Sequence, residues 1–278
     1  MTVLKKLYDK SKIWFAVAWI IAYCVLMSVG DSLSAEIGIE KTATLPIGIL
    51  LSAFLLLFLK KNGLFEEYGL CAPRASARSM LFYIPIGVML TANLWCGVAF
   101  RSDALQAVLF ISAMLCVGFL EEVIFRGLLF EAMRKDSVKA AIIVSSVTFG
   151  IGHIINLFNG SGAEFLPNLL QVVYATAAGF MFVMMYYRSQ SLTVCIAAHG
   201  IFNALSVFSN ENGTANETQM LTALLLTVIT GAYALYLALS MKGKPNDEPT
   251  CLAGKSENAA KEDPQVARDR SDGADHSA

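Results

Sequence analysis

The stretch GFLEEVIFRGLLF, Gly118 to Phe130, places two adjacent glutamates and an arginine inside an otherwise apolar run. The rest of the chain is also apolar: 56% of its 278 residues are hydrophobic, 15% are charged, and the mean hydropathy is +0.57. Soluble domains are nearer half apolar and about a quarter charged. The composition therefore predicts a membrane protein, in which a charged stretch needs a specific explanation.

Apolar runs along the chain are long enough to cross a hydrocarbon core of about 30 Å as helices. Backbone polar groups within a bilayer must be satisfied inside each segment, so helices are the expected form. The sequence predicts an all-α integral membrane protein, a bundle of about eight transmembrane helices within residues 1–241. The predicted spans are Ile13–Gly30, Ala43–Leu59, Met80–Phe100, Ala104–Met133, Val138–Phe158, Phe165–Tyr187, Leu192–Phe208 and Met220–Met241.

The loop charges give an independent test of this topology. Every second loop is basic, whereas the opposite loops hold only Lys41 and Arg101. The positive-inside rule then predicts both termini in the cytoplasm and, in a bacterium, the plasma (inner) membrane. Residues 242–278, with few large apolar side chains, are predicted to form a disordered cytoplasmic tail. The net charge of -1 gives no sign of a nucleic-acid partner.

The two glutamates are functional candidates because a charged side chain near the bilayer centre costs about 2.5–3.5 kcal/mol and therefore faces protein or a water-filled cavity. On a helix, Glu122 and Arg126 stand four residues apart and share a face, whereas Glu121 is turned by about 100°. We predict a Glu122–Arg126 ion pair that leaves Glu121 without a fixed counter-ion. Such a carboxylate suits a general base. The alternative is a purely structural buried cluster, or snorkelling near an interface.

Two of the three histidines, His153 and His199, also lie in predicted spans. Asn203 follows His199 by four residues, so both project from one helix face. Gly150 and Gly152 allow a neighbouring helix or a substrate backbone to come close. These groups suit hydrolysis, because a carboxylate can deprotonate water, an imidazole can orient it or protonate a leaving amine, and His with Asn can stabilise an oxyanion.

At these positions the sequence resembles the CPBP family, the CAAX proteases and bacteriocin-processing enzymes, also called the Abi family of intramembrane proteases. The family pattern is E-E-x-x-x-R, then F-x-x-x-H, then H-x-x-x-N or D, on successive helices. The resemblance is strongest over a motif-bearing core of about 104–208. The three motifs are intact and in order as Glu121-Glu122-Val-Ile-Phe-Arg126, Phe149-Gly-Ile-Gly-His153 and His199-Gly-Ile-Phe-Asn203.

The resemblance implies a helical bundle around a conical, water-accessible polar cavity, and an endopeptidase that cleaves a membrane-associated peptide or a prenylated protein C-terminus. It also implies a role for six of the seven motif residues. These roles are Glu121 as the water-activating base, His153 as its partner, His199 and Asn203 as oxyanion donors, and Glu122 with Arg126 as a supporting pair.

No cofactor is firmly implied, although zinc is possible. Family members are commonly labelled metalloproteases, and Glu121, His153 and His199 resemble a zinc set of two histidines and one glutamate. Because these residues come from three separate helices, a metal-independent glutamate mechanism is the preferred hypothesis. Two other functions stay open: a non-catalytic membrane peptide-binding or bacteriocin-immunity protein, and a proton-coupled transporter. The chain shows no repeated halves of the kind that many transporters have.

Overall fold

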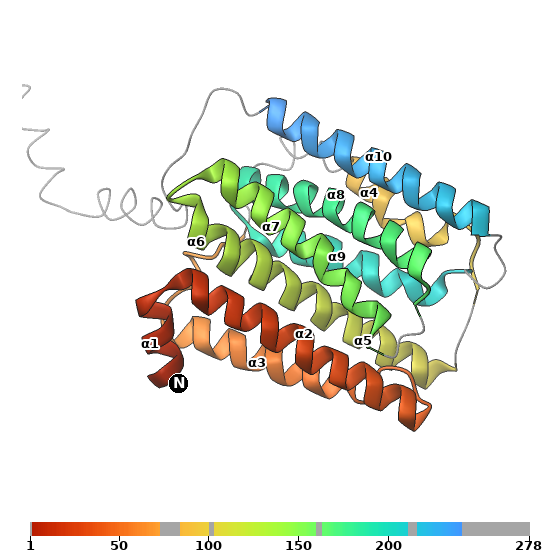
Figure 1. Ribbon diagram of the computed structural model, residues 1–278, viewed down its shortest axis with the longest axis horizontal. Coiled ribbons are helices and arrows are strands. Elements are labelled where there is room, and N and C mark those ends of the chain that lie inside the picture. The colour runs from red at the N-terminus through yellow and green to blue at the C-terminus, as the bar shows by residue number, and fades with distance from the viewer. Residues whose placement is uncertain (1, 73–83, 100–102, 160–162, 211–215, 241–278) are drawn as a thin grey trace, which may run out of the picture.

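The computed structural model describes residues 2–72, 84–99, 103–159, 163–210 and 216–240, and nearly all of them are helical. Figure 1 shows the long helices lying side by side. The predicted all-α class is confirmed. The α-helices are α1 (Thr2–Lys10), α2 (Lys12–Ile37), α3 (Thr44–Lys61), α4 (Ile84–Leu90), α5 (Ala104–Glu121), α6 (Glu131–Arg134), α7 (Val138–Gly152), α8 (Phe165–Ser189), α9 (Leu192–Leu205) and α10 (Asn216–Ser240).

Helices of other kinds interrupt or extend this series. Between α5 and α6 the chain forms a π-helix, η3 (Glu122–Phe130), so α5, η3 and α6 make one continuous rod. The shorter 3-10 helices are η2 (Ala92–Leu94), η4 (His153–Leu157) and η5 (Ser206–Phe208).

Six helices in the described residues are long and apolar enough to cross a membrane, so the chain is a multi-pass membrane protein, as predicted. They are Lys12–Ile37, Thr44–Lys61, Ala104–Arg134, Val138–Leu157, Phe165–Ser189 and Glu217–Ser240. The predicted span Leu192–Phe208 is present as a shorter apolar helix. The predicted tail, 242–278, lies outside the described residues.

The predicted span Met80–Phe100 needs a correction. Residues 80–83 and 100 lie outside the described residues, and the part from 84 to 99 is not one helix but α4, η2 and an irregular segment. Polar side chains explain the break. The Asn93 amide donates to the carbonyl of Phe202 at 2.6 Å, and Gly97 adopts a left-handed φ of 97°, which ends helical geometry.

Side-chain caps fix where several spans begin. Ser11 precedes α2 and accepts a hydrogen bond from the Trp14 amide, Asp103 precedes α5, and Ser137 precedes α7 with the same type of cap. These side chains satisfy amide groups that the first turn leaves without a partner. At its other end α2 stops at Gly38, whose φ of 79° forms a left-handed C-cap.

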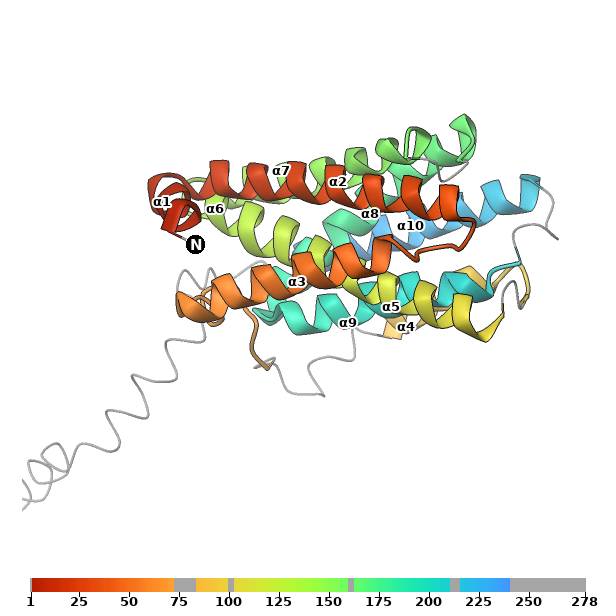
Figure 2. The ribbon, with the colours of Figure 1, turned by 90° about the horizontal axis from the view of Figure 1, so that it is seen from below.

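Two close helix crossings bring the centre of the bundle together. α5 packs along α9 (Figure 2), and a methyl group on Gly118 would lie 2.7 Å from the Gly200 Cα. α7 packs along α8, where a methyl group on Gly150 would lie 2.8 Å from the Thr176 Cα. Small residues allow helices in membranes to approach this closely. Both crossings lie next to motif residues, so they set the geometry of the candidate site.

Candidate active site

The double glutamate lies at the junction between α5 and the π-helix η3. Every residue from Glu122 to Phe130 is buried. π-Helices are rare and occur frequently at functional sites. About one π-turn separates Glu122 from Arg126, and the Arg126 Nη1 donates to Glu122 Oε1 at 3.0 Å with both side chains fully buried. The predicted ion pair is therefore present, although the helix that carries it is not the α-helix that the sequence suggested.

Aromatic rings enclose the arginine. The Arg126 guanidinium lies 4.2 Å from the centre of the Phe149 ring and 5.4 Å from that of Phe182. A guanidinium above a ring face is attracted by the negative charge of the π-system. Gly179 contributes a carbonyl 3.5 Å from Arg126 Nη2. The Arg126 guanidinium is thus surrounded by the Glu122 carboxylate, the Gly179 carbonyl and two aromatic rings.

His199 lies between the two glutamates. Its Nδ1 is 2.7 Å from Glu122 Oε1, and its Nε2 is 3.4 Å from Glu121 Oε2. The imidazole stacks on Phe182, with the rings 5.1 Å apart and inclined by 19°. Because a carboxylate accepts a proton, Nδ1 carries the hydrogen in the bond to Glu122, and Nε2 faces Glu121.

The close crossing of α5 and α9 explains why these groups meet. Gly118 precedes Glu121 by three residues, and Gly200 directly follows His199. Contact between the two glycines leaves no room for side chains between the helices. The glutamates and the imidazole are consequently held within hydrogen-bond range although 77 residues separate Glu122 from His199.

Glu121 has a different environment from its neighbour. The hydroxyl of Tyr23, on α2, donates to Glu121 Oε1 at 2.8 Å. No lysine or arginine pairs with Glu121 among the described residues, and His199 is its nearest basic group. Glu121 keeps 8% of its surface exposed whereas Glu122 has none. Of the two residues, Glu121 is therefore the less completely enclosed.

His153 is held by its own helix and by α8. Its Nδ1 is 3.1 Å from the Phe149 carbonyl, so Nδ1 donates the hydrogen and Nε2 is left as an acceptor. The amide of Asn168 donates to the His153 carbonyl at 2.9 Å. The Phe149 ring lies edge-on to both imidazoles, 5.0 Å from His153 and 5.6 Å from His199. Phe149 is thus the packing residue that joins the two histidines.

Asn203 lies one helical turn beyond His199 on α9, partly buried. Its side-chain amide makes no hydrogen bond to the part of the chain that the structure describes. It is therefore available to bind a ligand. Tyr23, Phe182 and Asn168 are site residues that the sequence analysis did not select. Asn168 carried a signal, since it is a polar residue in an apolar run, but Tyr23 carried none.

The described residues contain no group of three His, Cys, Asp or Glu side chains arranged to hold a metal ion. Glu121 and His199 are neighbours, but His153 does not complete a ligand set with them. The arrangement of the three residues therefore does not fit the zinc set of two histidines and one glutamate.

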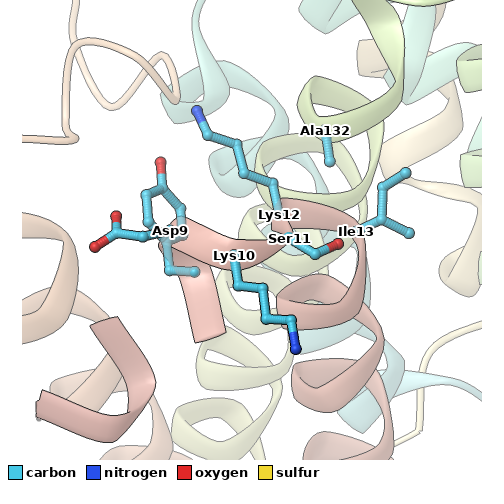
Figure 3. Close-up of a pocket in the computed structure, with 7 residues that line it drawn as sticks. Asp9, Lys10, Ser11, Lys12, Ile13 and Ala132 are labelled. Carbon is cyan, nitrogen blue, oxygen red and sulfur yellow. The ribbon is translucent and has the colours of Figure 1, made fainter. Parts of the chain in front are cut away.

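A cavity of about 390 Å³ lies elsewhere, at the joint between α1 and α2 (Figure 3). Figure 3 shows the side chains of Lys10 and Lys12 pointing in different directions. None of the motif residues lines this cavity, so it is separate from the candidate site. Its lining consists of Tyr8, Asp9, Lys10, Ser11, Lys12, Ile13 and Ala132.

The candidate site lies within a segment that is similar to a known protein family. Residues 103–205 match the family model described as type II CAAX prenyl endopeptidase Rce1-like. The segment is therefore similar to the Rce1-like family. All seven motif residues, from Glu121 to Asn203, fall within the matched segment, and the resemblance to CAAX proteases is confirmed at the level of the family.

The chain is also similar to the UPF0719 transmembrane protein of Aquifex aeolicus (strain VF5). That relative is 22% identical to this chain over 142 residues, which cover 50% of this chain and 52% of that protein. The match thus spans about half the length of the relative. No solved structure matches the chain. The Rce1-like segment corresponds to α5 through α9, so α1 to α4 and α10 lie outside it.

Proposed function

We propose that the protein is an intramembrane endopeptidase of the CPBP/CAAX-protease type, which hydrolyses a peptide bond of a membrane-associated substrate. The observation that carries the proposal is the bracketing of His199 by two glutamates of unlike environment within the Rce1-like segment. One glutamate is sealed with an arginine, and the other keeps an exposed edge. A structural ion pair alone would not require the second, partly exposed carboxylate.

In the proposed mechanism Glu121 takes a proton from a water molecule, whose oxygen then adds to the scissile carbonyl carbon. His153, with Nε2 free to accept, orients that water. When the C–N bond breaks, the proton held by Glu121 passes to the leaving amine, which returns Glu121 to its starting state. General acid–base catalysis of this kind contributes about 10²–10⁴-fold to rate.

The oxyanion would be stabilised from α9. The Asn203 amide supplies one donor. His199 supplies the other through Nε2, which requires both ring nitrogens to carry a proton, because Nδ1 is already bound to Glu122. Glu122 therefore orients the His199 ring, and Arg126 balances the charge of Glu122. This role extends the supporting function that the motif alone suggests.

The substrate class follows from the family description and from the membrane setting. A prenylated protein C-terminus or another membrane-associated peptide would reach Glu121 from within or beside the bilayer. The direct test is co-expression with candidate membrane peptides, followed by mass spectrometry of the products. New termini that are absent with a His153→Ala variant support the proposal. Identical peptide profiles with and without the chain, despite binding of the peptide, would favour the non-catalytic peptide-binding alternative.

Metal dependence needs its own experiment. In the metal-free mechanism a strong chelator has little effect, and Asn203→Ala slows turnover by about 10²–10³-fold, the cost of one oxyanion donor. The metal content of the purified protein, measured by mass spectrometry, would be the same in the wild type and in Asn203→Ala. Stoichiometric zinc that is lost together with activity in His153→Ala would contradict this mechanism and identify a metalloprotease.

We also propose that both termini face the cytoplasm. The basic ends of α3 and α6 lie at the same end of the bundle as α1 (Figure 1), which supports this orientation through the positive-inside rule. Reporter fusions after Lys61 and Lys135 should then read cytoplasmic, and fusions near Asp31 and Gly213 should read external. A cytoplasmic signal at Gly213 would contradict the topology.

A further inference from the structure

We propose that Tyr23 is a positioning residue for Glu121, so that α2, which precedes the matched segment 103–205, forms part of the active site. This inference rests on the proposed function. Tyr23 comes from a helix with no family motif and lies 98 residues before Glu121 in sequence. Its hydroxyl nevertheless donates to Glu121 Oε1 at 2.8 Å, and both residues are buried.

The hydrogen bond separates the roles of the two carboxylate oxygens. Tyr23 binds Oε1, while Oε2 lies 3.4 Å from His199 Nε2. Within the described residues no further hydrogen bond reaches this carboxylate. Tyr23 therefore restrains a side chain that would otherwise rotate, and keeps Oε2 directed toward the imidazole and the position of the attacking water. A reacting group that is misplaced by about 1 Å can lose roughly 10²-fold in rate.

Packing around Tyr23 supports a defined position for the hydroxyl. α2 packs against η3, and the buried face of α2 includes Trp19, Tyr23 and Met27 at successive turns. Such spacing places all three side chains on one face of the helix. Tyr23 is the one whose polar atom meets the glutamate pair. Tyr23 thus holds the Glu121 carboxylate as Arg126 and His199 hold that of Glu122, but unlike Arg126 it adds no permanent charge.

A matched control exists on the same protein. Tyr68 is also buried and donates its hydroxyl to another side chain, the Tyr8 hydroxyl at 2.9 Å. Tyr68→Phe removes one buried hydroxyl hydrogen bond outside the catalytic cluster. A purely structural role for Tyr23 predicts that Tyr23→Phe and Tyr68→Phe behave alike. A positioning role predicts that only Tyr23→Phe changes the chemistry.

The first measurement uses the full chain in detergent with a peptide that it cleaves. Tyr23→Phe should lower kcat by about 10- to 100-fold, with KM and the thermal unfolding temperature close to those of Tyr68→Phe. Equal kcat in Tyr23→Phe and wild type would overturn the inference. Glu121→Gln separates this failure from failure of the proposed function: an active Glu121→Gln variant refutes the proposed function, whereas an inactive one beside a fully active Tyr23→Phe refutes only the role of Tyr23.

The second measurement needs no substrate. Dicyclohexylcarbodiimide modifies carboxyl groups in apolar surroundings, and mass spectrometry locates the adduct. Loss of the Tyr23 hydroxyl frees Glu121 Oε1, so labelling at Glu121 should rise several-fold in Tyr23→Phe and stay at the wild-type level in Tyr68→Phe. Tyr23→Met provides a second hydroxyl-free variant if the phenylalanine variant folds poorly. Unchanged labelling of Glu121 in both Tyr23 variants would overturn the inference.

Discussion

The two adjacent glutamates have different environments. Glu122 is fully buried, forms an ion pair with Arg126, and is hydrogen-bonded to His199. Glu121, by contrast, keeps an exposed edge and receives a neutral hydroxyl from Tyr23. The proposed mechanism uses this difference: it assigns Glu122 to structure and orientation and Glu121 to chemistry.

Glu121→Gln should have the largest effect, and it tests whether Glu121 is the carboxylate that acts as the base. An amide cannot accept a proton from water, so turnover should fall by about 10⁴-fold, the upper range for a general base. Stability should hold, because glutamine can still accept the Tyr23 hydrogen bond through its carbonyl. Peptide cleavage and thermal unfolding of the purified variant check both parts. Wild-type turnover in this variant would end the proposed mechanism.

Glu122→Gln should have the opposite signature. It leaves Arg126 buried without its carboxylate, which costs about 3–5 kcal/mol of folding free energy. Denaturation of the purified variant measures this loss. The exposed i,i+4 pair Lys5–Asp9 is the matched control. Asp9→Asn should cost less than about 1 kcal/mol, because solvent screens that pair. Equal losses in the two variants would show that burial does not distinguish the pairs.

The sequence predicted those parts of the site that are local. The Glu122–Arg126 pair follows from a spacing of four residues, and the shared face of His199 and Asn203 follows from the helical period. The contacts of Glu121 with Tyr23 and of Glu122 with His199 join residues 98 and 77 positions apart. Such contacts depend on how helices cross, which the local pattern does not specify.

The fold could be predicted from the sequence only to the same extent, in its local features. Apolar composition predicted about eight spans, and six of them are long apolar helices in the described residues, because length and hydropathy are local properties. It did not indicate the break within 84–99, where the Asn93 side chain bonds a carbonyl on α9. Nor did it predict the π-helix η3, because its i→i+5 hydrogen bonds compete closely with those of an α-helix and tertiary packing decides between them.

Substitutions at the α5–α9 crossing test how the two glutamates are positioned, because this crossing places His199 next to both of them. In Gly118→Ala the new methyl group would meet Gly200 backbone atoms at 2.7 Å, which can be relieved only by separating the helices. We expect a loss of about 1–3 kcal/mol from overpacking. Turnover should fall as well, because His199 moves away from both glutamates.

Gly200→Ala is the control for this prediction. Its methyl group would meet the end of the Leu115 side chain at 3.2 Å, and that side chain can rotate. Its losses in unfolding temperature and in cleavage rate should therefore be the smaller. If Gly200→Ala proved as damaging as Gly118→Ala, the backbone contact would not be what sets the position of His199.

The smallest expected effect is at Gly152, on the exposed side of the site. A methyl group there would meet no atom within 4 Å, whereas one on Gly150 would collide with Thr176. Gly150→Ala should therefore destabilise the protein by about 1–3 kcal/mol. Gly152→Ala should leave the unfolding temperature unchanged or slightly raised, because alanine favours a helix over glycine by up to about 1 kcal/mol.

Gly152→Ala should also affect substrate binding, because Gly152 directly precedes His153. A substrate backbone that passes over this open turn would meet the methyl group, and KM should rise several-fold at constant kcat. Steady-state kinetics of the two variants test this. An unchanged KM in Gly152→Ala would place the substrate on a different approach to His153.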